Sequence, residues 1–288
     1  METRLNIPIR HFAASQTEQD FSLNFGIRSI VNLLAGKDMV QELHRHDFFY
    51  ILVLEKGAGH HEIDFSPYPV SDHAVFFMRP GQVHQLLLKA ESRGYLIHFN
   101  EAFYALHDKN SNQLLAKVSH VNHYQLTAER FQKILMILTD AFQEYSNKQE
   151  RYQEVIKANM KILFIELFRQ HQGKALTPVN LYMQEMLEKF LTLLEIHVFE
   201  HKQVSQYAEL LNLSTYQLNT IAKTMLGKTC SKLIDEYMIL EAKRCLLATS
   251  GQVNQIAYHL GYEDVSYFIR FFKKHTGFSP ESFRQNFS

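Results

Sequence analysis

Three histidines in the first third of the chain have a spacing that suits ligand binding. His44 and His46 lie two residues apart in LHRHDFFYILVLEKGAG, and His84 follows a Pro-Gly pair in MRPGQVHQL. Alternate residues of a β-strand point to the same side, so His44 and His46 are expected on one face. Converging imidazoles could bind a metal ion, contact a small molecule, or form a cluster with neither role. We predict no metal, cofactor or catalytic residue, and contact with a small ligand by His44, His46, Tyr50 and His84.

A second set of candidate residues lies in a repeat near the end of the sequence. The segments QYAELLNLSTYQLNTIAKTMLGKTC (206–230) and QIAYHLGYEDVSYFIRFFKKHTGFSP (255–280) align with a gap of one residue. Each has a short helical stretch, a turn and a longer helical stretch that ends at glycine. This pattern predicts two helix-turn-helix units, at about 204–227 and 253–277. The helical segment between them is long enough to let both units enter successive major grooves of one DNA duplex.

The second helix of each unit is predicted to have one apolar and one polar face. The apolar faces carry Leu218, Ile221, Ala222 and Met225 in the first unit and Phe268, Phe271, Phe272 and His275 in the second. The polar faces carry Tyr216, Thr220 and Lys223 in the first unit, with Asn219 at the edge, and Ser266, Arg270 and Lys273 in the second. Lys274 is a further candidate for DNA binding. Such side chains contact base edges and phosphates. Solvated faces without a partner are the alternative for either unit alone, but two matched units favour double-stranded DNA.

The pattern of apolar and polar residues in the rest of the chain predicts the strands and helices that position these residues. From about residue 21 to 100, short apolar or alternating runs are separated by Gly, Pro, Asp and Ser, which is typical of an antiparallel barrel or sandwich. Apolar residues recur at helical spacing between about 127 and 171, and QGKALTPVN (172–180) is a linker candidate. The predicted fold class is α+β: an antiparallel β-barrel with flanking helices, then an all-α domain of two helix-turn-helix units joined by a long helix.

Residues 181–288 resemble the DNA-binding domain of the AraC/XylS transcription regulators, most clearly in QIAYHLGYEDVSYFIRFFKKHTGFSPESFR. The resemblance implies base-facing roles for Tyr216, Asn219, Thr220, Ser266 and Arg270. The sequence departs from the family pattern at Thr220 and Tyr267, where a cationic or small polar residue is usual. We therefore expect the first unit to discriminate bases less strongly than the second.

The two histidine segments quoted above resemble the motifs of a cupin barrel, a sensor domain commonly attached to this DNA-binding module. The cupin pattern places a glutamate soon after the second histidine, whereas this chain has Asp47, Phe48, Phe49 and Tyr50. This departure favours burial of a small effector over a metal-dependent reaction.

The apolar surface of the helices between 127 and 171 exceeds what one flank of a barrel needs. The resemblance implies a homodimer formed through them, with candidate residues Leu135, Leu138, Ile162, Phe164 and Leu167. The alternative is that these helices only cover the open barrel. The domain prediction is a cupin-like effector-sensing domain (1–120), a helical dimerisation segment (121–172), a linker (173–180) and an AraC-type DNA-binding domain (181–288). Residues 1–20 are either an arm that docks differently in two states or a tail.

Composition limits the classes of protein to consider. Lys and Arg together number 30, as do Asp and Glu, so a basic surface must come from arrangement and not from net charge. The N-terminus METRLNIPIR lacks the apolar core of a secretory signal, and no apolar run approaches the roughly 20 residues of a membrane span. We expect a cytoplasmic protein with no membrane partner. Cys230 and Cys245 are expected to be buried thiols and not a disulfide.

These observations together predict a sequence-specific DNA-binding transcription regulator that is not an enzyme. It is expected to act as a ligand-responsive activator, with RNA polymerase as a further partner. One alternative is a cupin-type metalloenzyme or sugar isomerase with an attached regulatory domain. Another is an architectural protein of the nucleoid type.

Overall fold

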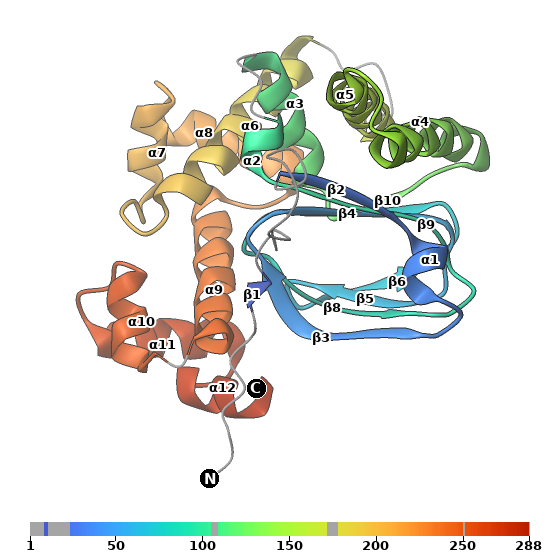
Figure 1. Cartoon of the computed structure of the whole chain (residues 1–288). Coiled ribbons are helices and arrows are strands. Elements are labelled where there is room, and N and C mark those ends of the chain that lie inside the picture. The colour runs from blue at the N-terminus through green and yellow to red at the C-terminus, as the bar shows by residue number, and fades with distance from the viewer. Residues whose placement is uncertain (1–8, 11–23, 105–108, 172–177, 250, 288) are drawn as a thin grey trace. The chain divides into compact units, whose positions relative to one another are not determined.

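The computed structural model of the 288-residue chain describes residues 9–10, 24–104, 109–171, 178–249 and 251–287. Residues 172–177 of the predicted linker, and the N-terminal segment 1–20 apart from Ile9 and Arg10, therefore lie outside the described residues, whereas residues 178–180 of the predicted linker begin a helix. The chain divides into two compact units, Pro8–Gly173 and a unit that contains Lys174–Ser288 (Figure 1). No helix in the described part of the chain is long and apolar enough to cross a membrane.

The first unit is built on two five-stranded sheets that face each other (Figure 1). One sheet has the order β1-β3-β8-β5-β6 and the other has the order β10-β7-β4-β9-β2. The strands of the first are Ile9–Arg10 (β1), Met39–His46 (β3), Val83–Leu88 (β8), Gly59–Ile63 (β5) and Ser66–Val70 (β6). Those of the second are His123–Gln125 (β10), Ala74–Met78 (β7), Phe49–Lys56 (β4), Arg93–Phe99 (β9) and Phe25–Ser29 (β2). The arrangement is a cupin-like sandwich and not a closed barrel, and the pairing is antiparallel except where β1 runs parallel to β3.

Strand β4 shows how the sequence encodes this arrangement. Its first six residues, FYILVL, are all buried, which is expected of a strand covered on both faces. Tyr50, Leu52 and Leu54 belong to the core between the two sheets. Phe49, Ile51 and Val53 alternate with them and belong to a second core, between this sheet and the helices. Because alternate side chains of a strand point to opposite faces, β4 contributes residues to both cores.

The helices of the first unit are Ile30–Leu34 (α1), Glu101–Tyr104 (α2), Lys109–Ser119 (α3), Ala128–Asn147 (α4) and Tyr152–His171 (α5). Thr127 caps α4 by accepting a hydrogen bond from the backbone N–H of Arg130. Helices α4 and α5 lie against the sheet that contains β2, β4 and β9 (Figure 1). They share the second core with that sheet. The helices thus cover one sheet of the sandwich, which is the alternative that the sequence analysis left open beside a homodimer interface.

This packing places most of the residues predicted for a dimer interface in the interior of the first unit. Leu138, Phe164 and Leu167 are 0% exposed in the core between α4, α5 and the sheet, and Leu135 packs against that core. A side chain already buried within one subunit has no surface left for a second. Of the predicted set, Ile162 alone is well exposed, at 41%.

The second unit is helical. It consists of Pro178–His197 (α6), Val204–Leu210 (α7), Thr215–Leu226 (α8), Cys230–Ala248 (α9), Val253–His259 (α10), Val265–Thr276 (α11) and Pro280–Phe287 (α12). Cys230 is a buried thiol, as predicted, whereas the thiol of Cys245 is only half-buried. Ser279 stands before α12 and its hydroxyl accepts from the backbone N–H of Ser282, which is the cap expected beside a proline at the first helical position.

The two helix-turn-helix units are alike in backbone hydrogen bonding. In the first unit the N–H of Leu213 donates to the carbonyl oxygen of Ala208 at 2.8 Å, and in the second that of Tyr262 donates to Ala257 at 2.9 Å. Helices α8 and α11 end in the same way, at Gly227 and Gly277, both with left-handed backbone. The repeat seen in the sequence is therefore a repeat in structure.

The buried faces of α8 and α11 largely follow the predicted phase. Leu218, Ile221 and Ala222 are buried in α8, and Phe268 and Phe272 in α11. Met225 and Phe271 are half-buried. His275, in contrast, is exposed, and its ring faces Asp235 with 3.9 Å between Nε2 and a carboxylate oxygen. The last turn of α11 lies at the edge of its buried apolar face, which explains why the polar His275 is found there.

Candidate functional site

The outer faces of α8 and α11 present equivalent positions. Tyr216 and Ser266, Thr220 and Arg270, and Lys223 and Lys273 correspond in the aligned repeat. Tyr216 is 80% exposed, and Lys223, Ser266, Arg270, Lys273 and Lys274 are all exposed, while Asn219 and Thr220 are half-buried. The two helices therefore carry matched polar faces, as the sequence predicts.

Arg270 of α11 is an exposed cationic side chain with only a weak ion pair inside the protein. The guanidinium of Arg270 is 3.8 Å from a carboxylate oxygen of Asp264, and both side chains are more than 60% exposed. Asp264 meanwhile caps α11 by accepting from the backbone N–H of Ser266 at 2.7 Å. An exposed ion pair of this length contributes little. Arg270 can therefore leave this ion pair for another partner.

Asn219 differs from the other candidates because both ends of its amide are already used. Its Nδ2 donates to the carbonyl oxygen of Thr215 at 3.0 Å, and its Oδ1 accepts from the backbone N–H of Cys230 at 3.0 Å. Cys230 begins α9, so Asn219 satisfies one of the unpaired N–H groups at that helix start. This bond joins α8 to α9, a link that the sequence could not reveal.

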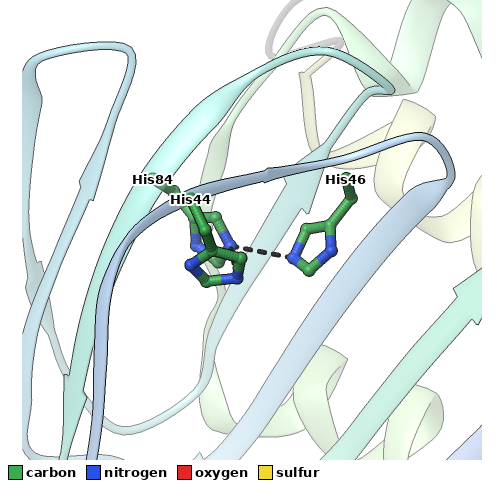
Figure 2. A group of neighbouring side chains, drawn as sticks. All are labelled: His44, His46 and His84. Carbon is green, nitrogen blue, oxygen red and sulfur yellow. Dashed lines mark hydrogen bonds between the residues drawn. The ribbon is translucent and has the colours of Figure 1, made fainter. Parts of the chain in front are cut away.

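The structure brings the predicted histidines together between the two sheets (Figure 2). His44 and His46 project from β3, and His84 projects from β8 at the position paired with His44. Nε2 of His84 lies 3.0 Å from Nε2 of His44 and 2.9 Å from Nε2 of His46. All three side chains are buried. Three imidazole nitrogens thus meet in the interior.

A fourth histidine completes what we call the histidine cluster (His44, His46, His61 and His84). His61 projects from β5, is 0% exposed, and its Nε2 lies 2.9 Å from Nδ1 of His84. Sequence reasoning missed it because HH at 60–61 shows that one histidine points inward without showing which. The aspartate that follows His46, Asp47, is exposed and is not part of the group of converging ligand atoms.

Burial keeps the imidazoles of the cluster neutral. Desolvation lowers the pKa of His44 to about 4 and the pKa values of His46 and His61 to about 3. It also holds the pKa of His84 well below 6.5. A neutral imidazole has one protonated nitrogen and one nitrogen with a lone pair, so each ring can both donate a hydrogen bond and bind an electron acceptor.

Several polar atoms around the cluster lack a hydrogen-bond partner among the described residues. They are Nδ1 of His46, Nδ1 of His61 and the hydroxyl of Tyr50. The ring of Tyr50 lies 5.3 Å from that of His46 and 5.4 Å from that of His84, measured between centroids. Leaving buried polar groups unpaired costs about 1–3 kcal/mol each. The sandwich interior therefore offers polar atoms to a bound group.

Comparison with known proteins gives matches over both units. Two family models match the chain, an AraC-like ligand binding domain over residues 36–157 and a helix-turn-helix domain over residues 207–286. The chain is similar to the HTH-type transcriptional activator RhaS of Enterobacter sp. (strain 638), with 25% identity over 251 residues that cover 84% of this chain and 87% of the relative. The same figures apply to RhaS of Escherichia coli O157:H7.

Two solved structures also resemble the chain. A transcriptional regulator with an AraC-type DNA-binding domain from Chromobacterium violaceum is 25% identical, with 36% of this chain and 92% of that chain covered and a TM-score of 0.34. ToxT from Vibrio cholerae, bound to an unsaturated fatty acid, is 14% identical, with 91% and 95% covered and a TM-score of 0.44.

Proposed function

The chain belongs to the AraC family of ligand-responsive, DNA-binding transcription regulators, and from this premise we propose that α8 and α11 are its base-reading helices. The observation that carries the proposal is the duplication itself. Two units with the same turn hydrogen bonds end in helices whose outer faces carry polar and cationic side chains at equivalent positions. The 19 residues of α9 span about 28 Å, close to the spacing of successive major grooves.

We assign the exposed residues to two kinds of contact. Tyr216, Thr220, Ser266 and Arg270 are proposed to contact base edges, and Lys223, Lys273 and Lys274 to contact phosphates. Arginine can bind guanine with two hydrogen bonds, whereas a lysine near the backbone positions the protein without reading sequence. For Asn219, the two hydrogen bonds within the protein support a role in holding α8 against α9, and any base contact would have to replace them.

The ligand-binding half is proposed to take up a small effector between the two sheets. His44, His46, Tyr50 and His84 are the proposed contacts, supported by their burial and by the unpaired hydroxyl of Tyr50. The relatives are named transcriptional activators, which supports activation as the effect on transcription and favours a regulator over a metalloenzyme or sugar isomerase. A protein with this function acts where the chromosome is, in the bacterial cytoplasm.

A homodimer is proposed on the outer side of α5. Val155 and Ile162 are exposed and lie seven residues apart on this helix, hence on one side of it. Contact with RNA polymerase remains part of the proposal for activation, as does an arm formed by residues 1–20.

Selection from a pool of randomised DNA duplexes tests the proposal. The full-length protein should enrich duplexes with two conserved segments about one helical turn apart, as expected for two units on one face. Binding to all duplexes with equal affinity would instead support the architectural alternative.

A further inference from the structure

We propose that Lys202 is a positioning residue that fixes the distance between α8 and α11, because it joins the first helix-turn-helix unit directly to the second. Lys202 lies in the loop between α6 and α7, residues 198–203. Its partners lie in the turn that follows α10, residues 260–262. The inference rests on the proposed function of α8 and α11, and it adds what holds these two helices at one separation.

The ammonium group of Lys202 contacts both the loop and the turn. Its Nζ donates to the carbonyl oxygen of Phe199, within the loop, at 3.0 Å, and to the carbonyl oxygen of Gly261. Nζ also lies 4.9 Å from the centroid of the Tyr262 ring. An ammonium group has three donors and no acceptor, so two carbonyl oxygens and the face of an aromatic ring are suitable partners for it. We call this set of contacts the Lys202 bridge.

The backbones of the loop and the turn also approach each other closely at the bridge. A Cβ on Gly261 would lie 1.9 Å from the carbonyl oxygen of Phe199 and 2.6 Å from Nζ of Lys202. The rings of Phe199 and His259 lie 5.4 Å apart between centroids, so the contact continues onto α10. The corresponding turn residue of the first unit is Asn212, which has a side chain. Glycine in the second unit therefore has a reason beyond its positive φ, namely the contact with the loop.

The loop is fixed to the first helix-turn-helix unit on both sides of Lys202. The hydroxyl of Tyr207, a buried residue of α7, donates to the carbonyl oxygen of His201 at 2.7 Å. Nε2 of Gln206 lies 3.2 Å from Nδ1 of His201, and Oε1 of Gln206 accepts from the backbone N–H of Gln203 at 2.9 Å. Lys202 thus stands between two residues that are anchored to α7.

The turn is fixed to the second helix-turn-helix unit in a similar way. The N–H of Gly261 donates to the carbonyl oxygen of Tyr258, and that of Tyr262 donates to Ala257, both at 2.9 Å. The ring of Tyr262 lies 5.2 Å from the ring of Phe268 in α11, measured between centroids. The Lys202 bridge therefore connects two ordered units directly, in addition to their connection through α9.

The length of α9 shows why a second connection matters. The 19 residues of this helix span about 28 Å. A rotation of roughly 7° about one end of the helix moves a group at the other end by about 3.4 Å, which is the rise of one base pair. A direct contact between the units restricts this rotation. It thereby restricts the half-site spacings that the protein accepts.

Operators of three lengths test the bridge. Binding of the full-length protein is measured to an operator selected from the randomised pool, and to two variants with one base pair inserted or deleted between the half-sites. The wild type should prefer the selected spacing. Lys202→Met should bind the selected operator about tenfold more weakly, because the separation of the units must then be fixed on binding. Its preference for the selected spacing should fall roughly fivefold, because the units can adjust to the altered spacings.

Two further variants separate the bridge from a general effect of charge. Lys189→Met removes the same charge from an exposed side chain of α6, and it should retain the wild-type spacing preference. Lys202→Arg keeps the charge and the donors, and it should retain more of the preference than Lys202→Met does. If Lys202→Met weakens binding to all three operators by the same factor, Lys202 acts as a phosphate contact and the proposal is overturned.

His259→Ala decides the matter if Lys202→Met does not fold. It removes the ring contact with Phe199 from an exposed position of α10, and it should also reduce the spacing preference. A folded His259→Ala protein with the wild-type preference would then contradict the proposal.

A double-mutant cycle without DNA separates the bridge from the proposed function. Lys202→Met and Tyr262→Leu, singly and together, are compared by urea unfolding of the full-length protein. We expect a coupling of about threefold or more in the unfolding equilibrium constant of the helical unit, the size of a cation–π contact. Additive effects overturn the bridge even where DNA binding is intact. A coupled pair in a protein that binds no operator supports the bridge and contradicts the proposed function instead.

Discussion

Asn212 and Gly261 occupy the same position in the turns of the two helix-turn-helix units, and both have left-handed backbone, with φ of 54° and 72°. Each is followed by a residue whose N–H donates back to an alanine of the preceding helix, Ala208 or Ala257. Asparagine and glycine are the residues that adopt this conformation at least cost. The sharp turn before each proposed recognition helix thus has the same backbone conformation in both units, although the left-handed residue is asparagine in one and glycine in the other.

Gly261→Ala is expected to destabilise the helical unit by about 1–3 kcal/mol. A Cβ at this position would collide with the carbonyl oxygen of Phe199, in addition to the strain of a positive φ. Asn212→Gly is the matched control, since glycine accepts the same backbone, and it should change stability by less than about 0.5 kcal/mol. Thermal unfolding followed by circular dichroism measures both. Equal effects of the two substitutions would refute this description of the turns.

Asn219→Ala should lower the stability of the helical unit by roughly 1 kcal/mol or more, because it leaves the N–H of Cys230 without its acceptor. If Asn219 only holds α8 against α9, the variant binds all DNA sequences more weakly and keeps the wild-type base preference. Competition binding against single-base operator variants decides. A changed preference at one base position would assign Asn219 to base reading instead.

Ile162→Glu should yield a folded monomer, because a carboxylate in an apolar contact between subunits must lose its hydration. Light scattering of the full-length protein gives the mass. Ile196→Glu is the control, since Ile196 is 65% exposed and belongs to the other unit. A dimer that survives Ile162→Glu moves the interface away from this side of α5.

The stability of the sandwich should fall as the pH decreases from 7.5 to 5.5. Burial lowers the pKa of His98 to about 4, whereas an unfolded imidazole titrates near 6.5. The unfolded state therefore binds more protons between these values, and acid favours it. In chelator-treated protein, His98→Gln should reduce the loss at pH 5.5 by roughly 1 kcal/mol, as measured by urea unfolding. The same pH dependence in both proteins would contradict the burial effect.

The sequence predicts the parts of this fold in which one period runs over a long segment. In both copies of the repeat, apolar residues recur at the same helical positions, around Leu218 and Phe268, and each helix ends at a glycine. Both helix-turn-helix units could therefore be predicted from local sequence alone. The alternation of buried residues likewise predicts sheets. Whether the sheets close into a barrel depends on contacts between distant strands, which no local pattern records.

The sequence also could not separate surface from core on α4 and α5. Leu138 and Ile162 are both aliphatic residues on amphipathic helices, yet one is fully buried and the other is 41% exposed. That difference comes from which side of each helix meets the sheet. In the same way, the contact of His61 with His84 arises from the pairing of β5 with β8.

We propose that α11 reads bases through Arg270 and contacts the DNA backbone through Lys273. Binding of two alanine variants to one operator tests this proposal most directly. Binding is measured to the selected operator and to its single-base variants at several salt concentrations. Arg270→Ala is expected to cost about 1–3 kcal/mol and to lose discrimination at one base position. Lys273→Ala is expected to weaken every sequence alike and to reduce the salt slope by about one. Wild-type relative affinities for all operator variants in the Arg270→Ala protein would contradict the claim.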